Sequence, residues 1–207
     1  MKQVFQADEI YTGTSILKDH VIVIENGIVT SIVPKDSTPS ITSIQTFTGC
    51  LIAPAFIDLQ LYGGNGKLFS HSLDLESLEA TFEYCKAGGC SHFLITMATN
   101  STENFLKGIE AVRAYKESGK KGLIGLHLEG PWINKSKKGA HIEAFIKKPT
   151  QDEVLNLLEK GKGIVKMITL APEECDDEII NLLIDNGIII SAGHSNSSYR
   201  RASQAFT

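Results

Sequence analysis

The chain has 207 residues, of which 42% are hydrophobic and 21% are charged, and its formal net charge is −4. This balance indicates a soluble globular protein and excludes an intrinsically disordered chain. The acidic balance argues against a nucleic-acid partner, and no apolar run is long enough to predict a membrane span or a signal peptide.

Residues 1–50 contain no amphipathic helical pattern and predict a small antiparallel sheet. Two β-rich runs meet at Asn26-Gly27, which is the strongest short signal for a two-residue hairpin turn. We expect this sheet to end near Gly49 and a first domain to end at residue 50.

From residue 51 onward, short apolar runs alternate with amphipathic segments. The runs predict five strands, which end at Leu61, Ala98, Glu129, Leu170 and Ala192. The intervening segments predict helices, one of which begins at the capping box 150–153. This alternation predicts a parallel sheet with helical crossovers.

An α/β barrel explains this alternation better than a doubly wound sheet does. The glycine-rich loop 63–66 follows a strand but lacks the G-x-G-x-x-G spacing of a dinucleotide site. Polar residues stand at several strand ends, as in a (β/α)8 barrel. A complete barrel takes about 250 residues, so we interpret residues 51–207 as its first five or so β/α units.

Glu129 and His194 each stand where a predicted strand ends. Glu129 closes an apolar run, and Gly130-Pro131 cannot continue the strand. His194 follows a second apolar run, next to Gly193. Singly, the glutamate could cap a turn and the histidine could be an ordinary loop residue. Together, at the functional end of barrel strands, a carboxylate and an imidazole favour a zinc-type site.

Three separated motifs extend this interpretation. They are His127-Leu-Glu-Gly-Pro-Trp-Ile-Asn134, Lys137-Lys-Gly-Ala-His141 and Ser191-Ala-Gly-His-Ser-Asn196. Together they resemble the N-acetylglucosamine-6-phosphate deacetylase family of the amidohydrolase superfamily, and residues 53–63 resemble its first barrel strand. The resemblance implies a metal-bearing barrel, incomplete in residues 51–207. It also implies that residues 1–50 are the N-terminal part of a small β-sandwich built from both chain ends.

The resemblance assigns roles by position. Glu129 matches the metal-binding glutamate, and His194 matches the first metal-binding histidine. Ala140 and His141 match substrate-binding positions, with His141 at the sugar and its acetamido carbonyl. Without the resemblance, His141 would be a solvated loop histidine. Gln60 stands where most amidohydrolases carry a histidine; because an amide is a weaker zinc ligand than an imidazole, we expect one metal, with Gln60 lining its site.

No catalytic residue is assigned within the chain. The resemblance places the second histidine ligand, the general-base aspartate and the phosphate-binding groups beyond Thr207. A catalytic zinc usually has three protein ligands and one open position, and the resemblance supplies two of them here. We therefore expect the 207-residue chain alone to be inactive.

The implied reaction of the full-length enzyme is hydrolysis of the acetamide of N-acetyl-D-glucosamine 6-phosphate to glucosamine 6-phosphate and acetate. One divalent metal, expected to be zinc, would activate water and polarise the carbonyl. The implied partner is a small phosphorylated amino sugar, and the full-length form is expected to be a homodimer. The four cysteines show no paired metal spacing and fit a cytoplasmic protein with free thiols.

Two alternatives stay open at this stage. A different amidohydrolase acting on a cyclic amide or on another N-acylated amino sugar would use much the same scaffold. Outside enzymes, the chain could be an inactive truncated fragment that folds only with another copy.

Overall fold

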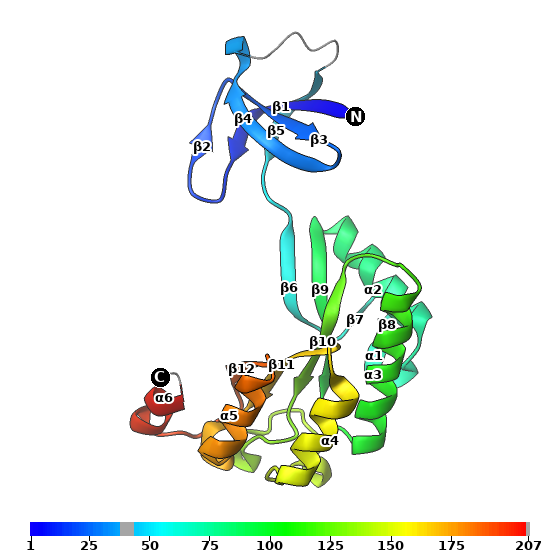
Figure 1. Cartoon of the computed structure of the whole chain (residues 1–207), viewed down its shortest axis with the longest axis vertical. Coiled ribbons are helices and arrows are strands. Elements are labelled where there is room, and N and C mark those ends of the chain that lie inside the picture. The colour runs from blue at the N-terminus through cyan, green and yellow to red at the C-terminus, as the bar shows by residue number, and fades with distance from the viewer. Residues whose placement is uncertain (38–43, 206–207) are drawn as a thin grey trace. The chain divides into compact units, whose positions relative to one another are not determined.

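The computed structural model describes residues 1–37 and 44–205, and its contacts divide the chain into two compact units, Met1–Ala55 and Phe56–Thr207 (Figure 1). The boundary expected at residue 50 falls within a strand of the first unit, β5 (Gln45–Ile52).

The first unit is a five-stranded sheet in which β1 is central. Besides β5, its strands in chain order are β1 (Lys2–Tyr11), β2 (Ile16–Leu17), β3 (His20–Glu25) and β4 (Ile28–Pro34), and β4 is followed by the 3₁₀ turn η1 (Lys35–Ser37). The predicted hairpin is confirmed: β3 and β4 pair antiparallel around Asn26 and Gly27, whose φ angles of 53° and 81° suit a two-residue turn. Val4, Val21 and Val23 form a small core against this sheet.

The expectation of a purely antiparallel sheet ending near Gly49 is wrong in two respects. Strand β5 continues through Gly49 to Ile52, and it pairs with β1 in parallel. A parallel pair needs a long connection, and β5 pairs with β1, the first strand, and not with β4, which precedes it in the chain. The sequence pattern predicts strands but not which edge a distant strand joins.

The second unit is built on a parallel sheet with the strand order β12-β11-β10-β9-β6. Its strands are β6 (Phe56–Leu61), β9 (Cys90–Ala98), β10 (Leu123–Glu129), β11 (Val165–Leu170) and β12 (Ile189–Ala192). Every strand therefore lies beside its predecessor in the sheet, as in successive units of an α/β barrel. The five predicted strands end at the predicted residues.

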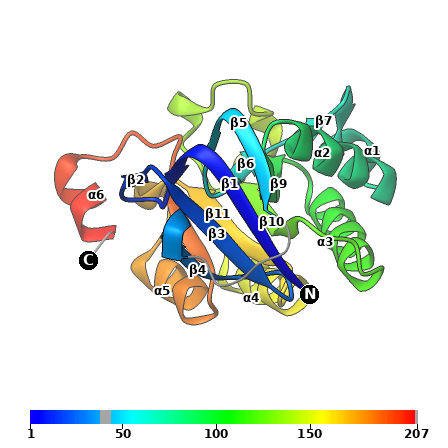
Figure 2. The same ribbon diagram turned by 90° about the horizontal axis from the view of Figure 1, so that it is seen from above.

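Helices connect these strands and lie next to one another in chain order, as Figures 1 and 2 show. They are α2 (Leu75–Ala87), α3 (Thr102–Glu117), α4 (Gln151–Gly161), α5 (Asp177–Asp185) and the last helix α6 (Tyr199–Ala205). Side-chain caps begin four of them. The predicted cap of α4 is confirmed because the Thr150 side chain accepts a hydrogen bond from the Glu153 amide.

Shorter elements occupy the connections. The glycine-rich loop after β6 forms a two-stranded hairpin, β7 (Gly63–Gly64) with β8 (Lys67–Leu68), followed by α1 (Phe69–Ser72). The 3₁₀ turns η2 (Lys135–Lys137) and η3 (Glu143–Phe145) lie in the long connection after β10, and η4 (Pro172–Glu174) follows β11. No helix in the described part of the chain is long and apolar enough to cross a membrane.

The core of the second unit lies between the sheet and its helices. Leu126 and Leu128 on β10 pack in one cluster with Ile168 on β11 and with Ile109 and Val112 on α3. The central strands are buried along most of their length, whereas the edge strands β6 and β12 expose much of theirs. Parallel strands in chain order, with an open edge on each side among the described residues, fit part of an α/β barrel.

Candidate metal centre

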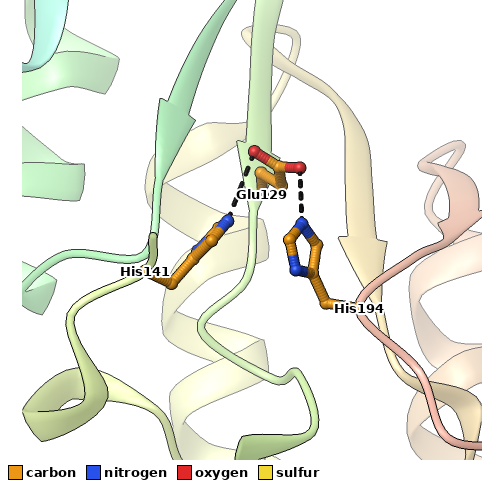
Figure 3. A group of neighbouring side chains, drawn as sticks. All are labelled: Glu129, His141 and His194. Atoms are coloured by element: carbon orange, nitrogen blue, oxygen red, sulfur yellow. Dashed lines mark hydrogen bonds and ion pairs between the residues drawn. The ribbon is translucent and has the colours of Figure 1, made fainter. Parts of the chain in front are cut away.

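Three side chains converge at the carboxyl ends of the central strands. Glu129 lies between His141 and His194 (Figure 3). Its Oε1 is 3.1 Å from His194 Nε2, and its Oε2 is 3.5 Å from His141 Nε2. The candidate ligand atoms of the three residues all lie within 4.8 Å of one another. Glu129 and His141 are only 5% and 7% exposed, so the cluster is largely shielded from solvent.

The backbone explains how these residues meet. Glu129 is the last residue of β10, and Gly130 follows with φ 84°, a conformation that ends the strand. A Cβ on Gly130 would lie 2.1 Å from Thr99 Oγ1, so glycine is also required for space. His194 follows β12 with φ 50°, which is unusual for a residue other than glycine.

The donor set suits a divalent metal. His194 Nδ1 lies 2.9 Å from the carbonyl oxygen of Lys137, which can only accept, so Nδ1 carries the proton. This leaves Nε2, which faces Glu129, as the nitrogen available to a metal, as in a metal-ligating histidine whose other nitrogen is fixed by a backbone carbonyl. Two imidazoles and a carboxylate are a ligand set that zinc favours.

Glu129 is held ionised by its neighbours. Burial opposes its ionisation, but hydrogen bonds with His141, Tyr62 and His194 outweigh that effect and lower its pKa to about 2. Gln60 Nε2 donates to Glu129 Oε1 at 3.0 Å, and the Tyr62 hydroxyl donates to Oε2. Burial and the neighbouring carboxylate in turn raise the pKa of Tyr62 to about 12, so it remains a neutral donor.

His141 is fixed from behind by Thr99, the first residue after β9. Thr99 Oγ1 is 2.7 Å from His141 Nδ1, and the same hydroxyl lies 3.2 Å from the backbone oxygen of Glu129. The other imidazole nitrogen of His141 therefore faces Glu129. This arrangement allows His141 either to bind a metal or to contact a group that enters the site.

Beneath the cluster, His127 ties neighbouring strands together. Its Nδ1 donates to the Leu59 carbonyl at 2.9 Å, and its Nε2 lies 2.7 Å from the Thr169 hydroxyl. Burial is the main cause of its lowered pKa, so the ring stays neutral. We assign His127 to the support of the site because it is 1% exposed and its ring nitrogens are already bonded.

The predicted site residues meet in part. Glu129, His141 and His194 form one cluster, and Gln60 borders it through Glu129. Ala140 lies exposed beside His141, and its predicted substrate contact stays a prediction. The resemblance separates His141 from the metal ligands, whereas the structure places its Nε2 as near the carboxylate as a ligand would lie.

Sequence reasoning missed Tyr62, Thr99 and Glu173. Tyr62 follows Gln60 by two residues, the spacing that returns a side chain to the same face of a strand. Thr99 and Glu173 stand directly or almost directly after β9 and β11, at the same sheet edge as Glu129. Applying the strand-end rule to every strand, not only to those followed by histidine or glutamate, would have found the latter two.

Comparisons with known proteins agree with this architecture. The family model for the NagA composite domain matches residues 8–49. An N-acetylglucosamine-6-phosphate deacetylase from Haemophilus influenzae is 34% identical over 197 residues, which cover 95% of this chain and 51% of that protein. An N-acetylgalactosamine-6-phosphate deacetylase from Shewanella is 37% identical over 150 residues, which cover 72% of this chain and 38% of that protein.

A solved structure extends the match to the whole fold. The N-acetylglucosamine-6-phosphate deacetylase from Pasteurella multocida is 31% identical with a TM-score of 0.89, and the match covers 100% of this chain and 54% of that one. The chain thus spans about half the length of the first curated relative and of this structure. Over its whole length it is similar to N-acetylglucosamine-6-phosphate deacetylases, and it shares an N-terminal portion of their fold.

Proposed function

We propose that the full-length protein containing this chain hydrolyses the acetamide of N-acetylglucosamine 6-phosphate with the help of one divalent metal. The observation that carries the proposal is the cluster of Glu129, His141 and His194 at the strand ends. The named activities of the relatives in Haemophilus and Pasteurella support the substrate class.

Glu129 and His194 would hold the metal, with zinc the element that their donor atoms suit best. When bound, such a metal supplies a Lewis acid and a source of hydroxide at neutral pH. Gln60 and Tyr62 orient the Glu129 carboxylate through hydrogen bonds, and the Lys137 carbonyl keeps the proton of His194 on Nδ1. His141, held by Thr99, would donate from Nε2 to the substrate carbonyl and orient the sugar. Proton transfer to the leaving amine requires a group that we expect beyond Thr207.

A second substrate deserves a direct comparison because the Shewanella relative is named for the galactosamine epimer. The two sugars differ only in the configuration at one hydroxyl, and the relatives from Haemophilus and Pasteurella are both named for the glucosamine derivative. We therefore propose the glucosamine derivative as the preferred substrate and the galactosamine derivative as the competitor.

The metal assignment is tested by removing single ligands from the full-length protein. Glu129→Gln and His194→Ala should each lose zinc during dialysis against a weak chelator, because each substitution removes one of the atoms proposed to bind the metal. Glu178→Gln, a change at an exposed position of α5, is the control and should retain zinc. Full zinc occupancy in both ligand variants would overturn the assignment.

The substrate assignment is tested with four sugars: the N-acetylated forms of glucosamine and galactosamine, each with and without the 6-phosphate. Acetate release should be fastest for N-acetylglucosamine 6-phosphate. Faster release from the galactosamine 6-phosphate derivative would favour the second candidate. Activity on none of the sugars, with zinc present, would reject the function.

We further propose a cytoplasmic homodimer. All four cysteines are free in the structure, which fits a reducing compartment. Sedimentation of the full-length protein would establish whether it is dimeric.

A further inference from the structure

We propose that Glu173 is a positioning residue for His194, acting through the loop that carries this histidine. The inference rests on the proposed metal site and extends it by one residue, whose carboxylate bonds the loop that follows His194. Glu173 lies in η4, directly after β11, and β11 is the strand between β10 and β12.

The Glu173 carboxylate accepts hydrogen bonds from four donors in two loops. Its Oε2 accepts hydrogen bonds from Ser195 Oγ at 2.7 Å and Ser197 Oγ at 2.6 Å, while its Oε1 accepts from the Asn196 amide at 2.6 Å. The fourth donor is Asn134 Nδ2, which lies 3.1 Å from Oε1. A carboxylate that accepts several bonds from one loop fixes its backbone, and bonds to an ionised acceptor are about twice as strong as neutral ones.

The same network reaches His194 from its other side. The backbone amide of Asn134 donates to the backbone carbonyl of His194 at 3.0 Å. The Asn134 side chain also caps η2, accepting from the Ser136 amide at 2.9 Å. That turn supplies the Lys137 carbonyl to which His194 Nδ1 donates. Glu173 therefore braces both the backbone and the ring orientation of His194.

His194 needs such bracing because its backbone has φ 50°. An L-residue in the left-handed region persists only where its surroundings hold it there. The residues that follow His194 immediately, 195–197, are the ones bound to Glu173. Without the carboxylate, the loop is expected to relax and to move His194 Nε2 away from Glu129.

The charge of Glu173 is maintained by these bonds. Partial burial raises the pKa of its carboxyl, but hydrogen bonds from Ser197, Ser195 and the Asn196 amide outweigh burial and lower it to about 2. The acceptor is thus ionised at any pH at which the protein would work. A neutral amide in its place has one acceptor oxygen and cannot satisfy the same set of donors.

The experiment measures Zn²⁺ affinity of the metal-free full-length protein by competition with a chromophoric chelator. Glu173→Gln should weaken Zn²⁺ binding by about 10- to 100-fold, the range seen when a group that orients a metal ligand is removed. The matched control is Glu174→Gln, because Glu174 also accepts from Asn134 but bonds none of residues 195–197. It should bind Zn²⁺ like the wild type.

Hydrogen exchange on the metal-free variants separates positioning from general loss of structure. Glu173→Gln should speed amide exchange in the segment 193–198 while leaving exchange in β10 and β11 unchanged. Should Glu173→Gln not fold, the double variant Ser195→Ala with Ser197→Ala replaces it, because that variant removes two donors and keeps the carboxylate. It too should weaken Zn²⁺ binding and speed exchange in 193–198.

The possible results are distinguishable. Wild-type Zn²⁺ affinity in Glu173→Gln or its substitute, or an equal loss in Glu174→Gln, overturns the positioning role while leaving the metal site in place. Undiminished Zn²⁺ affinity in His194→Ala instead rejects the metal site itself and the positioning role with it. Weaker binding in Glu173→Gln and His194→Ala, with Glu174→Gln unaffected, supports both.

Discussion

At His194, an unfavourable backbone conformation is stabilised by hydrogen bonds with residues that are distant in sequence. Its left-handed backbone costs of the order of 1 kcal/mol for a residue other than glycine. The ring is nevertheless held at both ends, by the Lys137 carbonyl at Nδ1 and by Glu129 at Nε2. Strain of this kind persists where several neighbours determine one geometry, which is common at functional sites.

The role of His141 leads to the first prediction at this scale. His141→Ala in the full-length protein should lower turnover by about 10²-fold, as expected for loss of a group that acts at the reacting carbonyl, while zinc content stays near that of the wild type. Thr99→Val keeps the shape of Thr99 but removes the hydroxyl 2.7 Å from His141 Nδ1, so it should act in the same direction. Metal analysis beside steady-state kinetics checks both; loss of zinc in His141→Ala would make this histidine a ligand.

A second residue-scale prediction concerns acid stability. The pKa of Glu173 is lowered to about 2 from an ordinary 4.5, so its contribution to stability is present above the ordinary value and is lost as the pH falls toward 2. Urea unfolding of the metal-free protein should therefore show a larger fall in stability between about pH 5 and pH 3 for the wild type than for Glu173→Gln. Parallel falls in both proteins would contradict this assignment.

The sequence pattern predicts some of the site residues but not others. Glu129 and His194 could be predicted because each follows an apolar run that a glycine terminates. The contacts of Tyr62 and Glu173 could not be predicted, because they join residues that are distant in sequence. Tyr62 lies 67 positions from Glu129, and Glu173 lies 22 positions from Ser195. Such contacts depend on strand order and side-chain rotamers, which local patterns do not specify.

At the scale of the elements, the spacing between β10 and β11 positions the site. Gly125 on β10 has no side chain to keep the strands apart: a Cβ there would lie 2.4 Å from the Ile164 carbonyl oxygen and 2.6 Å from Lys166 Cγ. The register of the two strands shifts just beyond this point, between Leu126 and His127. The shift lets His127 face Thr169 and brings Glu129 to the sheet edge.

Gly125→Ala should therefore destabilise the full-length protein by about 1–3 kcal/mol, the usual cost of overpacking a buried position. Gly88→Ala is the matched control, since a Cβ at Gly88 meets its nearest neighbour at an ordinary 3.5 Å and the residue lies at the end of α2. The free energy of unfolding of Gly88→Ala should stay within about 0.5 kcal/mol of the wild-type value. Urea denaturation measures both, and equal losses would argue against a special requirement at Gly125.

The elements themselves were largely predictable. Strand ends at Glu129 and Ala192 and the hairpin at Asn26-Gly27 agree with the pattern because turn chemistry and apolar runs are local signals. The parallel pairing of β5 with β1 and the hairpin of β7 with β8 were not predicted. The first depends on a distant partner, and the second is too short to show any periodicity.

At the scale of the whole molecule, two open edges dominate the second unit. Strands β6 and β12 each have one neighbour among the described residues. The apolar side chains Phe56, Ile57 and Ile189 at these edges are 58–71% exposed. Unpaired, apolar strand edges promote association with other chains.

Residues 1–207 expressed alone should accordingly show no steady deacetylase turnover with added Zn²⁺, and they should associate. We propose that the general base lies outside these residues, and its absence would remove a contribution of about 10²–10⁴-fold. Light scattering should reveal species larger than a monomer. The full-length protein assayed in parallel is the control. Turnover by residues 1–207 comparable to that protein would mean that the described cluster already contains a complete site.

The place of β11 between β10 and β12 has a thermodynamic consequence. Glu129 and His194 meet across this strand, so a chain in which β11 has not inserted keeps both ligands but loses their convergence. A metal held at the proposed site would bind the native state and not such misassembled states, and a concentration one hundred times its dissociation constant would favour the native state by about 2.7 kcal/mol. Metal occupancy therefore reports whether the strands have assembled in the correct order.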